Sequence, residues 1–481
     1  MSVAMQDIHL VLMMPEILVA VMAMALLLLS AWTQKGGAGV VHWLTVITIV
    51  AVILVIKVGE GGATTFGGQF VTDGFARYMK ILLCMAMIFP ILMSSDYIRR
   101  HAMDGGEYHV VAMFALLGGM VMVSSGGFVI LYLGLELMSL SFYVLAAWRR
   151  DDVRSGEAGL KYFVLGSVAS GLLLYGMSMV YGVTGVLGFK EVAAFLATPE
   201  GQGSQLVALG VVMILAGMGF KIAAAPFHMW APDVYEGAPT PVTAFMAVMP
   251  KVAAIAVLFR ILFDVFASYH GQWQPILQLF AVLSMGVGAF AGLIQTNIKR
   301  LLAYSSISHV GYILIGLVAN TQEGAQGVLV YLTIYLFMSV GVFAIIIAFD
   351  RQGLGDNIRD YQGLAYKQPL LAFVMAMFMF SMAGIPPLAG FIGKLNIFMA
   401  AVKAGMVPLA VVGVLFSAIG AFYYIRVVKV MYFDQPEGEY KVSVVGGGFL
   451  AVSVSLVLIF LWGILPGDLL AWSGAGVQGF H

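Results

Sequence analysis

The sequence predicts an all-α polytopic membrane protein with about fourteen transmembrane helices. Of its 481 residues, 61% are hydrophobic and only 10% are charged, whereas an ordinary soluble domain carries about 25% charged residues. The apolar residues fall into runs of roughly 20, the length that crosses a bilayer as a helix. Because the connections between these runs are short, we expect no separate soluble domain.

Two of the expected spans contain interior prolines. The expected bounds of all the spans are 10–32, 40–58, 75–96, 108–125, 127–148, 160–185, 205–235, 240–266, 274–294, 299–319, 325–349, 368–402, 406–432 and 443–470. The seventh holds Pro226 with Pro232, and the twelfth holds Pro386 with Pro387. Proline removes a backbone donor and breaks or kinks a helix, so we expect both spans to be discontinuous. Paired broken helices in two halves are typical of transporter ion paths.

The distribution of basic residues predicts the orientation of the chain. Connections after odd-numbered spans contain most of them: Lys35, Arg99, Arg100, Arg149, Arg150, Arg154, Lys299, Arg300, Arg351, Arg359, Lys367 and Lys441. Connections after even-numbered spans contain fewer: Lys57, Arg77, Lys190 and Lys403. By the positive-inside rule, the first group is cytoplasmic and both termini are expected outside.

Four charged residues lie well inside apolar runs, namely Glu136, Lys221, Lys251 and Lys394. A charge at the bilayer centre costs roughly 3 kcal/mol on insertion scales, so each needs a reason, and an ion or proton path is the first hypothesis. Simpler explanations stay open. The first two residues would also form a static buried ion pair. Lys251 would also satisfy backbone carbonyls, and Lys394 would also snorkel toward an interface.

A buried lysine is suited to proton exchange near neutral pH. Its ordinary pKa is about 10.4. Burial lowers the pKa of a lysine by up to 3 to 5 pH units, and a nearby carboxylate raises it again. A swing of three pH units corresponds to about 4 kcal/mol, while moving one charge against 100 mV requires about 2.3 kcal/mol. A proton relay is therefore energetically feasible.

Several other chemistries are excluded by the sequence. The single cysteine, Cys84, cannot form an internal disulfide or hold an iron–sulfur cluster. The GFIGKL segment around Lys394 lacks the spacing and the hydroxyl of a phosphate-binding loop. A formal net charge of zero argues against nucleic-acid binding. We therefore expect no cofactor on this chain and an energy source on other proteins.

An internal repeat is visible between the fifth and tenth spans. Aligning ELMSLSFYVL from Glu136 with SSISHVGYIL from Ser305 pairs Ser139 with Ser308, and it pairs Tyr143 with Tyr312. Each segment is followed further along the chain by a proline-containing span. Units of five spans enter the membrane from opposite sides and would be inverted. Two identities in ten positions also arise by chance, so both explanations remain.

Three long blocks make the sequence recognisable. They are KIAAAPFHMWAPDVYEGAPTPVTAF (221–245), QTNIKRLLAYSSISHVGY (295–312) and GIPPLAGFIGK (384–394). These blocks resemble the antiporter-like membrane subunits of respiratory complex I, and the likeness covers nearly the whole chain. Within that family the sequence is most similar to the N type, because Lys394 stands where the M type has glutamate.

The resemblance implies a fold of fourteen helices with two inverted five-helix units, spans 4–8 and 9–13. It implies an N-terminal region over 1–106, a first repeat over 107–270, an inverted second repeat over 271–434 and a last helix over 435–481. Glu136 with Lys221 would form the charge pair of the first half. Lys251 would be the central connecting lysine and Lys394 the terminal one.

Three further residues match polar positions of the family, namely Lys161, His228 and His309. Each has an alternative explanation. Lys161 lies near an expected helix start, where an interfacial lysine is ordinary. Either histidine would also simply bond a carbonyl that a helix break sets free.

The resemblance also implies a function and partners. The chain would belong to the membrane arm of a proton-pumping NADH:quinone oxidoreductase and take part in proton translocation. Electrons would pass through flavin mononucleotide (FMN) and iron–sulfur clusters to quinone on other subunits. Expected partners are the M-type antiporter-like subunit, the small K-type and J-type subunits and lipids, in a bacterial inner membrane. Alternatives are a subunit of a multi-subunit Na⁺/H⁺ antiporter and a non-pumping scaffold, although the four charges argue against a scaffold.

Overall fold

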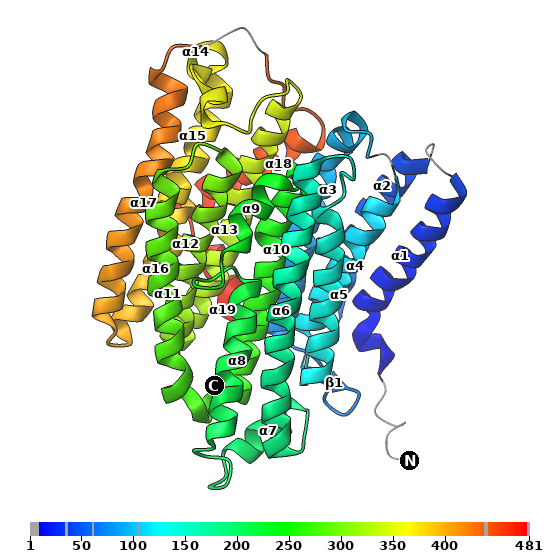
Figure 1. Ribbon diagram of the computed structural model, residues 1–481, viewed down its shortest axis with the longest axis vertical. Helices are drawn as coiled ribbons and strands as arrows, with labels where there is room; N and C mark the ends of the chain where they lie inside the picture. Colours follow the sequence, from blue (N-terminus) through cyan, green and yellow to red (C-terminus); the bar gives the residue numbers. More distant parts are fainter. Residues whose placement is uncertain (1–8, 34–36, 60–61, 104, 437–440, 479–481) are drawn as a thin grey trace.

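The computed structural model describes residues 9–33, 37–59, 62–103, 105–436 and 441–478, and long helices run side by side through it (Figure 1). The helices are α1 (Met14–Thr33), α2 (Ala38–Val58), α3 (Gly74–Arg100), α4 (Glu107–Val123), α5 (Phe128–Ala146), α6 (Val153–Thr184), α7 (Phe189–Leu196), α8 (Gln205–Lys221), α9 (Trp230–Gly237), α10 (Thr240–Phe259), α11 (His270–Leu293), α12 (Ile298–Val318), α13 (Gln322–Asp350), α14 (Leu364–Lys367), α15 (Pro369–Ala383), α16 (Ala389–Lys403), α17 (Val407–Phe433), α18 (Gly447–Ile464) and α19 (Gly467–Gly476). A π-helical turn (Arg260–Val265) extends α10. Strands β1 (Ala63–Thr65) and β2 (Phe70–Thr72) form an antiparallel hairpin.

The predicted class, an all-α membrane protein, is confirmed. Within the described ranges, 11 helical segments are long and apolar enough to cross a membrane, and α4, α8 and α15 are shorter apolar helices. These segments coincide with the expected spans, although the count of fourteen crossings stays a prediction. The last span ends at Ile464, earlier than expected, because residues before Pro466 disfavour the helical conformation. Helices α7, α14 and α19 and the hairpin were not predicted.

Both expected helix breaks are present. Helix α8 ends at Lys221 and α9 begins at Trp230, while α15 ends at Ala383 and α16 begins at Ala389. Pro226 lies inside the first break, whereas Pro232 lies in the first turn of α9. A helix needs no N–H donor from its first turn, so Pro232 does not interrupt α9.

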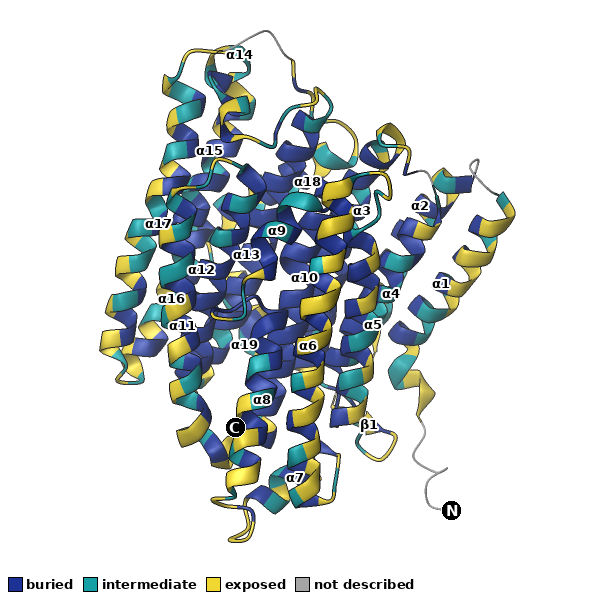
Figure 2. Cartoon of the chain, in the orientation of Figure 1, coloured by how far each residue is buried: buried dark blue, intermediate teal, exposed yellow. Residues whose placement is uncertain are grey.

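Three helices form the centre of the bundle. The most apolar windows of α10 and α13 are 100% buried and that of α12 is 94% buried, against 28% for α1. Figure 2 shows the same division, with buried residues in the middle and exposed residues on the outer helices. These central helices carry Lys251, His309 and Tyr335. The sequence therefore places these three polar side chains inside the bundle.

Close backbone contacts fix the helices that carry functional side chains. A Cβ added to Gly118 of α4 would lie 2.6 Å from the Gly134 carbonyl oxygen of α5. A Cβ added to Gly288 of α11 would lie 2.5 Å from the Tyr304 carbonyl oxygen of α12. Small residues allow such close approach between membrane helices. Helices α5 and α12 are therefore held rigidly against their neighbours.

Candidate functional site

The three lysines predicted from the apolar runs are all buried. Their relative exposures are 4% for Lys221, 2% for Lys251 and 6% for Lys394. A buried ammonium group is costly unless hydrogen-bond acceptors surround it. The structure supplies acceptors to each of the three, and it does so in different ways.

Lys221 is held by hydroxyl groups. Its Nζ donates hydrogen bonds to Ser139 Oγ at 2.8 Å, Ser170 Oγ at 3.3 Å and Tyr143 Oη at 3.4 Å. These acceptors lie on α5 and α6, so the side chain ties three helices together. Lys221 is also the last residue of α8, where the helix dipole favours a positive charge.

Lys394 is held by the end of the other broken helix. Its Nζ donates to the carbonyl oxygens of Met382 at 3.1 Å and Ala383 at 2.8 Å, and to Ser417 Oγ at 2.8 Å. The two carbonyls belong to the last turn of α15, which has no helical partners for them. The snorkelling alternative therefore does not describe Lys394. Both breaks instead place an ammonium group at a helix C-terminus.

Lys251 begins a chain of hydroxyl groups across the centre. Its Nζ donates to Tyr235 Oη at 2.6 Å and to the Ala247 carbonyl at 3.1 Å. The Ser306 hydroxyl lies close to that of Tyr235, and Tyr335 Oη and Ser306 Oγ are hydrogen-bonded at 2.9 Å. These residues come from α10, α9, α12 and α13. The expectation that Lys251 satisfies a backbone carbonyl holds, but it is only part of its environment.

His309 continues the polar region toward the second half. One ring nitrogen, Nδ1, lies 2.7 Å from Tyr331 Oη, and the other, Nε2, lies 3.1 Å from Tyr424 Oη. The His309 ring centroid is 5.1 Å from that of Tyr335, and Tyr424 is hydrogen-bonded to Ser305. The alternative that His309 bonds a freed carbonyl is not what the structure shows. Its partners are tyrosine hydroxyls.

Glu136 and Lys221 are expected as the charge pair of the first half, and the alternative for them is a static buried ion pair; the described residues show no direct ion pair between the two. In the described part of the chain no ion pair within 4 Å joins them, because Ser139 and its neighbours occupy the lysine. They still interact electrostatically. Glu136 is half-buried, and its Oε1 has no hydrogen-bond partner among the described residues. The Glu136 carboxylate therefore lies near Lys221 but is not hydrogen-bonded to it.

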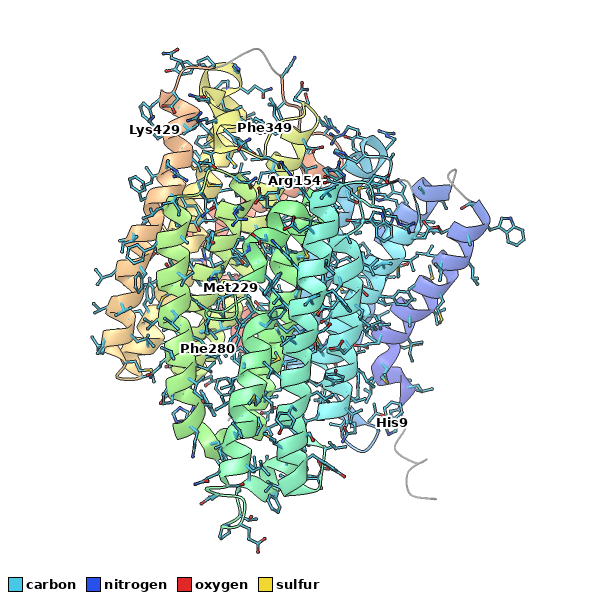
Figure 3. All side chains as sticks on the ribbon, viewed as in Figure 1. His9, Arg154, Met229, Phe280, Phe349 and Lys429 are labelled. Atoms are coloured by element: carbon cyan, nitrogen blue, oxygen red, sulfur yellow. The ribbon has the colours of Figure 1, made fainter. Side chains whose placement is uncertain are left out.

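Two predicted supporting residues lie outside this buried set. Lys161 is 40% exposed and pairs with Glu157 and Asp233, both at 2.7 Å. Asp233 also pairs with Arg300 at 2.7 Å, so Lys161 belongs to a partly exposed ion-pair network. His228 is half-buried at the first break and contacts the backbone of Pro226. The neighbouring Met229 lies on the surface (Figure 3).

Sequence reasoning overlooked a further buried ion pair. Lys80 Nζ of α3 lies 2.6 Å from Glu16 Oε1 of α1, with side-chain exposures of 2% and 3%. The contact has the distance of an ion pair but not the angle of a hydrogen bond. Both residues fall inside expected spans, so the signal that identified Lys221 was available here too. Tyr235, Ser306 and Tyr335 were also missed, because serine and tyrosine are ordinary in membrane helices.

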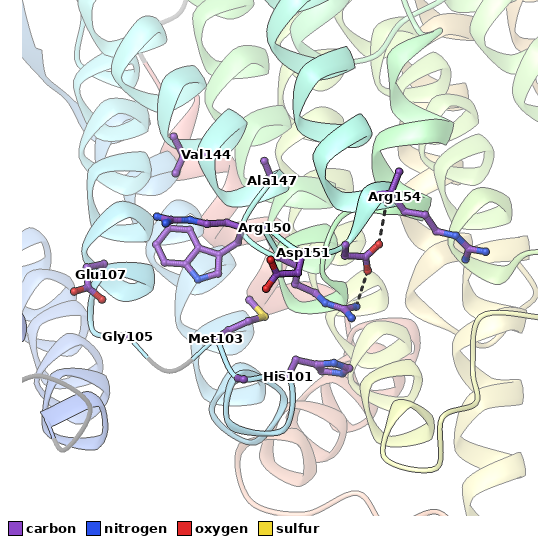
Figure 4. A pocket seen from close by; sticks show the side chains of 14 residues that line it. His101, Met103, Gly105, Glu107, Val144, Ala147, Arg150, Asp151 and Arg154 are labelled. Atoms are coloured by element: carbon purple, nitrogen blue, oxygen red, sulfur yellow. Dashed lines mark hydrogen bonds and ion pairs between the residues drawn. The ribbon is translucent and has the colours of Figure 1, made fainter.

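A surface pocket of about 940 Å³ lies apart from these groups (Figure 4). The connections before α4 and before α6 line it, and Arg150, Asp151 and Arg154 surround it. None of the predicted site residues lines it. Throughout the described ranges, no group of three or more His, Cys, Asp or Glu side chains is placed to hold a metal ion.

The arrangement favours proton exchange over ligand binding. The hydroxyl groups from Tyr235 to Tyr335 both donate and accept hydrogen bonds, and Lys251 becomes an acceptor when it loses its proton. Aromatic rings lie between the Lys221 and Lys251 sites. Tyr162 and Trp230 stack with their ring centroids 4.4 Å apart, and they contact Tyr143 on one side and Tyr235 on the other. The described contacts thus form one polar cluster around Lys221 and a longer one from Lys251 toward His309.

Comparison with known proteins identifies the family. The description of that family is NADH:quinone oxidoreductase/Mrp antiporter, TM, and its profile matches residues 125–420. The chain belongs to this family. A protein of Magnetococcus marinus is 55% identical over 475 residues, covering 98% of each chain, and one of Parvibaculum lavamentivorans is 50% identical over 469 residues, covering 97% of this chain and 96% of the relative. Both are named NADH-quinone oxidoreductase subunit N, so the expected resemblance to the N type is confirmed.

Solved structures agree with this assignment. A chain of respiratory complex I from Thermus thermophilus with bound aureothin is 33% identical, with a TM-score of 0.80 and coverage of 95% of this chain and 98% of that chain. A chain of the Mrp complex from a Dietzia species is 20% identical, with a TM-score of 0.83 and coverage of 97% of both chains. The second match shows a shared fold alone. The family description covers both NADH:quinone oxidoreductase and Mrp antiporter chains, and the names of the two relatives favour the oxidoreductase.

Proposed function

We propose that this chain is the N-type subunit in the membrane arm of an NADH:quinone oxidoreductase and carries protons through its buried lysines. The observation that carries the proposal is the placement of Lys221, Lys251 and Lys394 inside the bundle, each held by groups that exchange or accept protons. Ionisable residues at membrane depth are a functional hypothesis by default. The names of the relatives indicate that electron transfer from NADH to quinone drives this proton movement.

Each lysine has a distinct part in this proposal. Lys221 holds a proton among three hydroxyls, and the unsaturated Glu136 modulates that site from nearby. Lys251 passes a proton into the Tyr235–Ser306–Tyr335 chain of hydroxyls. Lys394 holds a proton at the end of α15. The supporting parts of Lys161, His228 and His309 are also proposed, and the surroundings of His309 favour it most.

The two halves are proposed to be inverted repeats with the expected limits, 107–270 and 271–434. Tyr143 and Tyr312, which the sequence alignment pairs, each lie beneath a lysine. Lys221 Nζ is 5.9 Å from the Tyr143 ring centroid, and Lys394 Nζ is 5.1 Å from that of Tyr312. Lys221 is the last residue of α8, and Lys394 of α16 binds the C-terminal carbonyls of α15. Residues 1–106 and 435–481 would flank the repeats.

Neighbouring subunits are expected on specific faces. Glu136 lies on a stripe of α5 between exposed Leu133 (59%) and Leu140 (51%). Acids at membrane depth rarely face lipid, so we propose that a small subunit of the K or J type covers this stripe. The M-type subunit would be a further neighbour in the membrane arm. Both termini would lie in the periplasm of a bacterium. The flavin, the iron–sulfur clusters and the quinone would be bound by partner subunits.

Isolation of the tagged chain tests the assignment. It should co-purify with an assembly that oxidises NADH and reduces quinone. In that assembly, Glu136→Gln and Lys221→Ala should lower the proton-to-electron ratio while NADH oxidation by an artificial acceptor continues. Lys403→Ala is the control, because its side chain is 61% exposed. An unchanged ratio in both variants would refute the proton role, and recovery without NADH oxidation would refute the assembly.

A further inference from the structure

A groove opens at the end of the bundle where α1 begins and α2 ends. Its volume is about 840 Å³. Figure 3 shows His9, one of its lining residues, at the foot of α1. The other lining residues are Val11, Leu12, Met14, Pro15, Leu54, Val55, Ile56, Val58, Gly59, Ala63, Thr72, Arg77 and Lys80. None of them belongs to the lysine sites described above.

The groove is amphipathic along the direction of the helices. His9, Thr72 and Arg77 lie where the helices begin or end, and the ends of membrane-spanning helices are expected near the membrane interface. Pro15 and Leu54 lie about one turn deeper and are apolar. A phospholipid has the same division, with a polar phosphate at the interface and acyl chains below it.

The charged lining residues are cations. Arg77 and Lys80 line the groove, and no carboxylate is among its described lining residues. Among the described residues, Glu16 pairs with Lys80 at 2.6 Å and Asp73 pairs with Arg260 at 3.0 Å. The Lys80 charge is balanced by its partner. Of the described lining residues, Arg77 is therefore the cation available to an anionic ligand.

Arg77 is also held in place. Its Nε donates to the Ile56 carbonyl at 3.2 Å and its Nη2 to the Lys57 carbonyl at 2.9 Å. A guanidinium group has five N–H donors, so these bonds fix the group at the groove and leave donors for a phosphate. Arginine is well suited to bind phosphate oxygens in pairs.

We propose that this groove binds one anionic phospholipid. Its phosphate lies on Arg77, and an acyl chain lies against Pro15, Leu54 and Val55. The lipid fills the space between α1, α2 and α3. This site is separate from the proton path and does not depend on the proposed function.

Photolabelling of the purified assembly tests the site. The probe is phosphatidylglycerol with a photoreactive diazirine on an acyl chain, and labelled residues are mapped by mass spectrometry. Labelling at Leu54 and Val55 is expected, and Arg77→Gln should lower it about tenfold, the effect of losing a hydrogen-bonded charge. Arg77→Lys should restore part of it. Labelling that Arg77→Gln leaves unchanged, or that zwitterionic phosphatidylcholine matches, would overturn the proposal.

A second pair of variants separates binding from folding. Leu54→Trp fills the apolar part of the groove but keeps every charge, so it should lower labelling of Val55 while the assembly stays intact. Arg99→Gln, at the other end of α3 with a side chain 75% exposed, should change nothing. Absence of labelling in the groove of the unaltered protein with either lipid would show that lipid does not occupy it.

Discussion

Lys251 and Tyr335 bind the same backbone oxygen, the carbonyl of Ala247, at 3.1 and 3.3 Å. Lys251 belongs to α10 in the proposed first repeat, and Tyr335 belongs to α13 in the second. A single acceptor therefore joins the two halves at the centre of the bundle. Tyr335 is also hydrogen-bonded to Ser306, whose hydroxyl lies close to Tyr235, the acceptor for Lys251.

Replacing Tyr335 by phenylalanine should weaken proton transfer between the halves. The variant keeps the ring but removes the hydroxyl that contacts Ser306 and Ala247. The loss of net hydrogen-bond stabilisation should be about 1 kcal/mol, and the proton-to-electron ratio should fall. Tyr366→Phe is the matched control, because Tyr366 is 63% exposed. A ratio that stays the same in Tyr335→Phe would remove Tyr335 from the path.

Replacing Gly384 by alanine should displace Lys394. Gly384 has φ +87°, and an added Cβ would lie 2.9 Å from Lys394 Cδ. Gly405 has φ +78° with nothing within 4 Å, so Gly405→Ala isolates the backbone cost of roughly 1–2 kcal/mol that both variants share. Only Gly384→Ala should also lower the proton-to-electron ratio. Equal ratios in the two variants would contradict the role of Lys394.

Much of the fold was predictable because membrane spans need long apolar runs. The two helix breaks followed from Pro226 and from Pro386 with Pro387. The hairpin was not predictable, because its strands have three residues each and Val71 bonds the distant Ser124 carbonyl. The short helices α7 and α19 were missed for the same reason. Their stability comes from tertiary packing rather than from length.

The candidate site was only partly predictable. Lys221, Lys251 and Lys394 stand out because a charge in an apolar run is rare. The hydroxyls that hold them do not stand out, since Ser306 and Tyr335 are adjacent to Tyr235 only in space. Glu16 and Lys80 carried the same signal as the other charges and were still overlooked. Sequence reasoning did not show that Lys221 is hydrogen-bonded to Ser139, while its interaction with Glu136 is electrostatic and not a direct contact.

The effects of replacing Glu16 and Lys80 on the free energy of unfolding should be strongly coupled. Either Glu16→Leu or Lys80→Met leaves one charge buried without its partner, which costs about 3–5 kcal/mol. The double variant removes both charges and should be close to the unaltered protein, since apolar replacements of buried pairs are often neutral. The thermal unfolding midpoint of the purified assembly measures this cycle. Additive effects of the two single changes would show that the pair does not act as a unit.

Asp73 should make stability depend on acidic pH. It caps the N-terminus of α3 by accepting from Ala76 N–H at 2.7 Å, and it pairs with Arg260. Burial raises the pKa of the Asp73 carboxyl, but the Arg260 charge and hydrogen bonds from Arg260 and Ala76 lower it more, so the net pKa lies below the ordinary 3.8. Because the pKa of Asp73 is lower in the folded state than in the unfolded state, the ionised carboxylate stabilises the fold at pH values above the unfolded-state pKa. This stabilisation is lost as the pH falls through the folded-state pKa.

Asp73→Asn isolates this charge, because asparagine caps a helix about as well as aspartate. Near neutral pH the unaltered protein should unfold at a higher temperature than Asp73→Asn, since only aspartate pairs with Arg260. As the pH falls through the folded-state pKa, which lies below 3.8, the carboxylate becomes protonated and the two unfolding midpoints should converge. Exposed Asp151→Asn controls for the loss of one acid. A difference that stays constant through this range would mean that the Arg260 pair does not stabilise the start of α3.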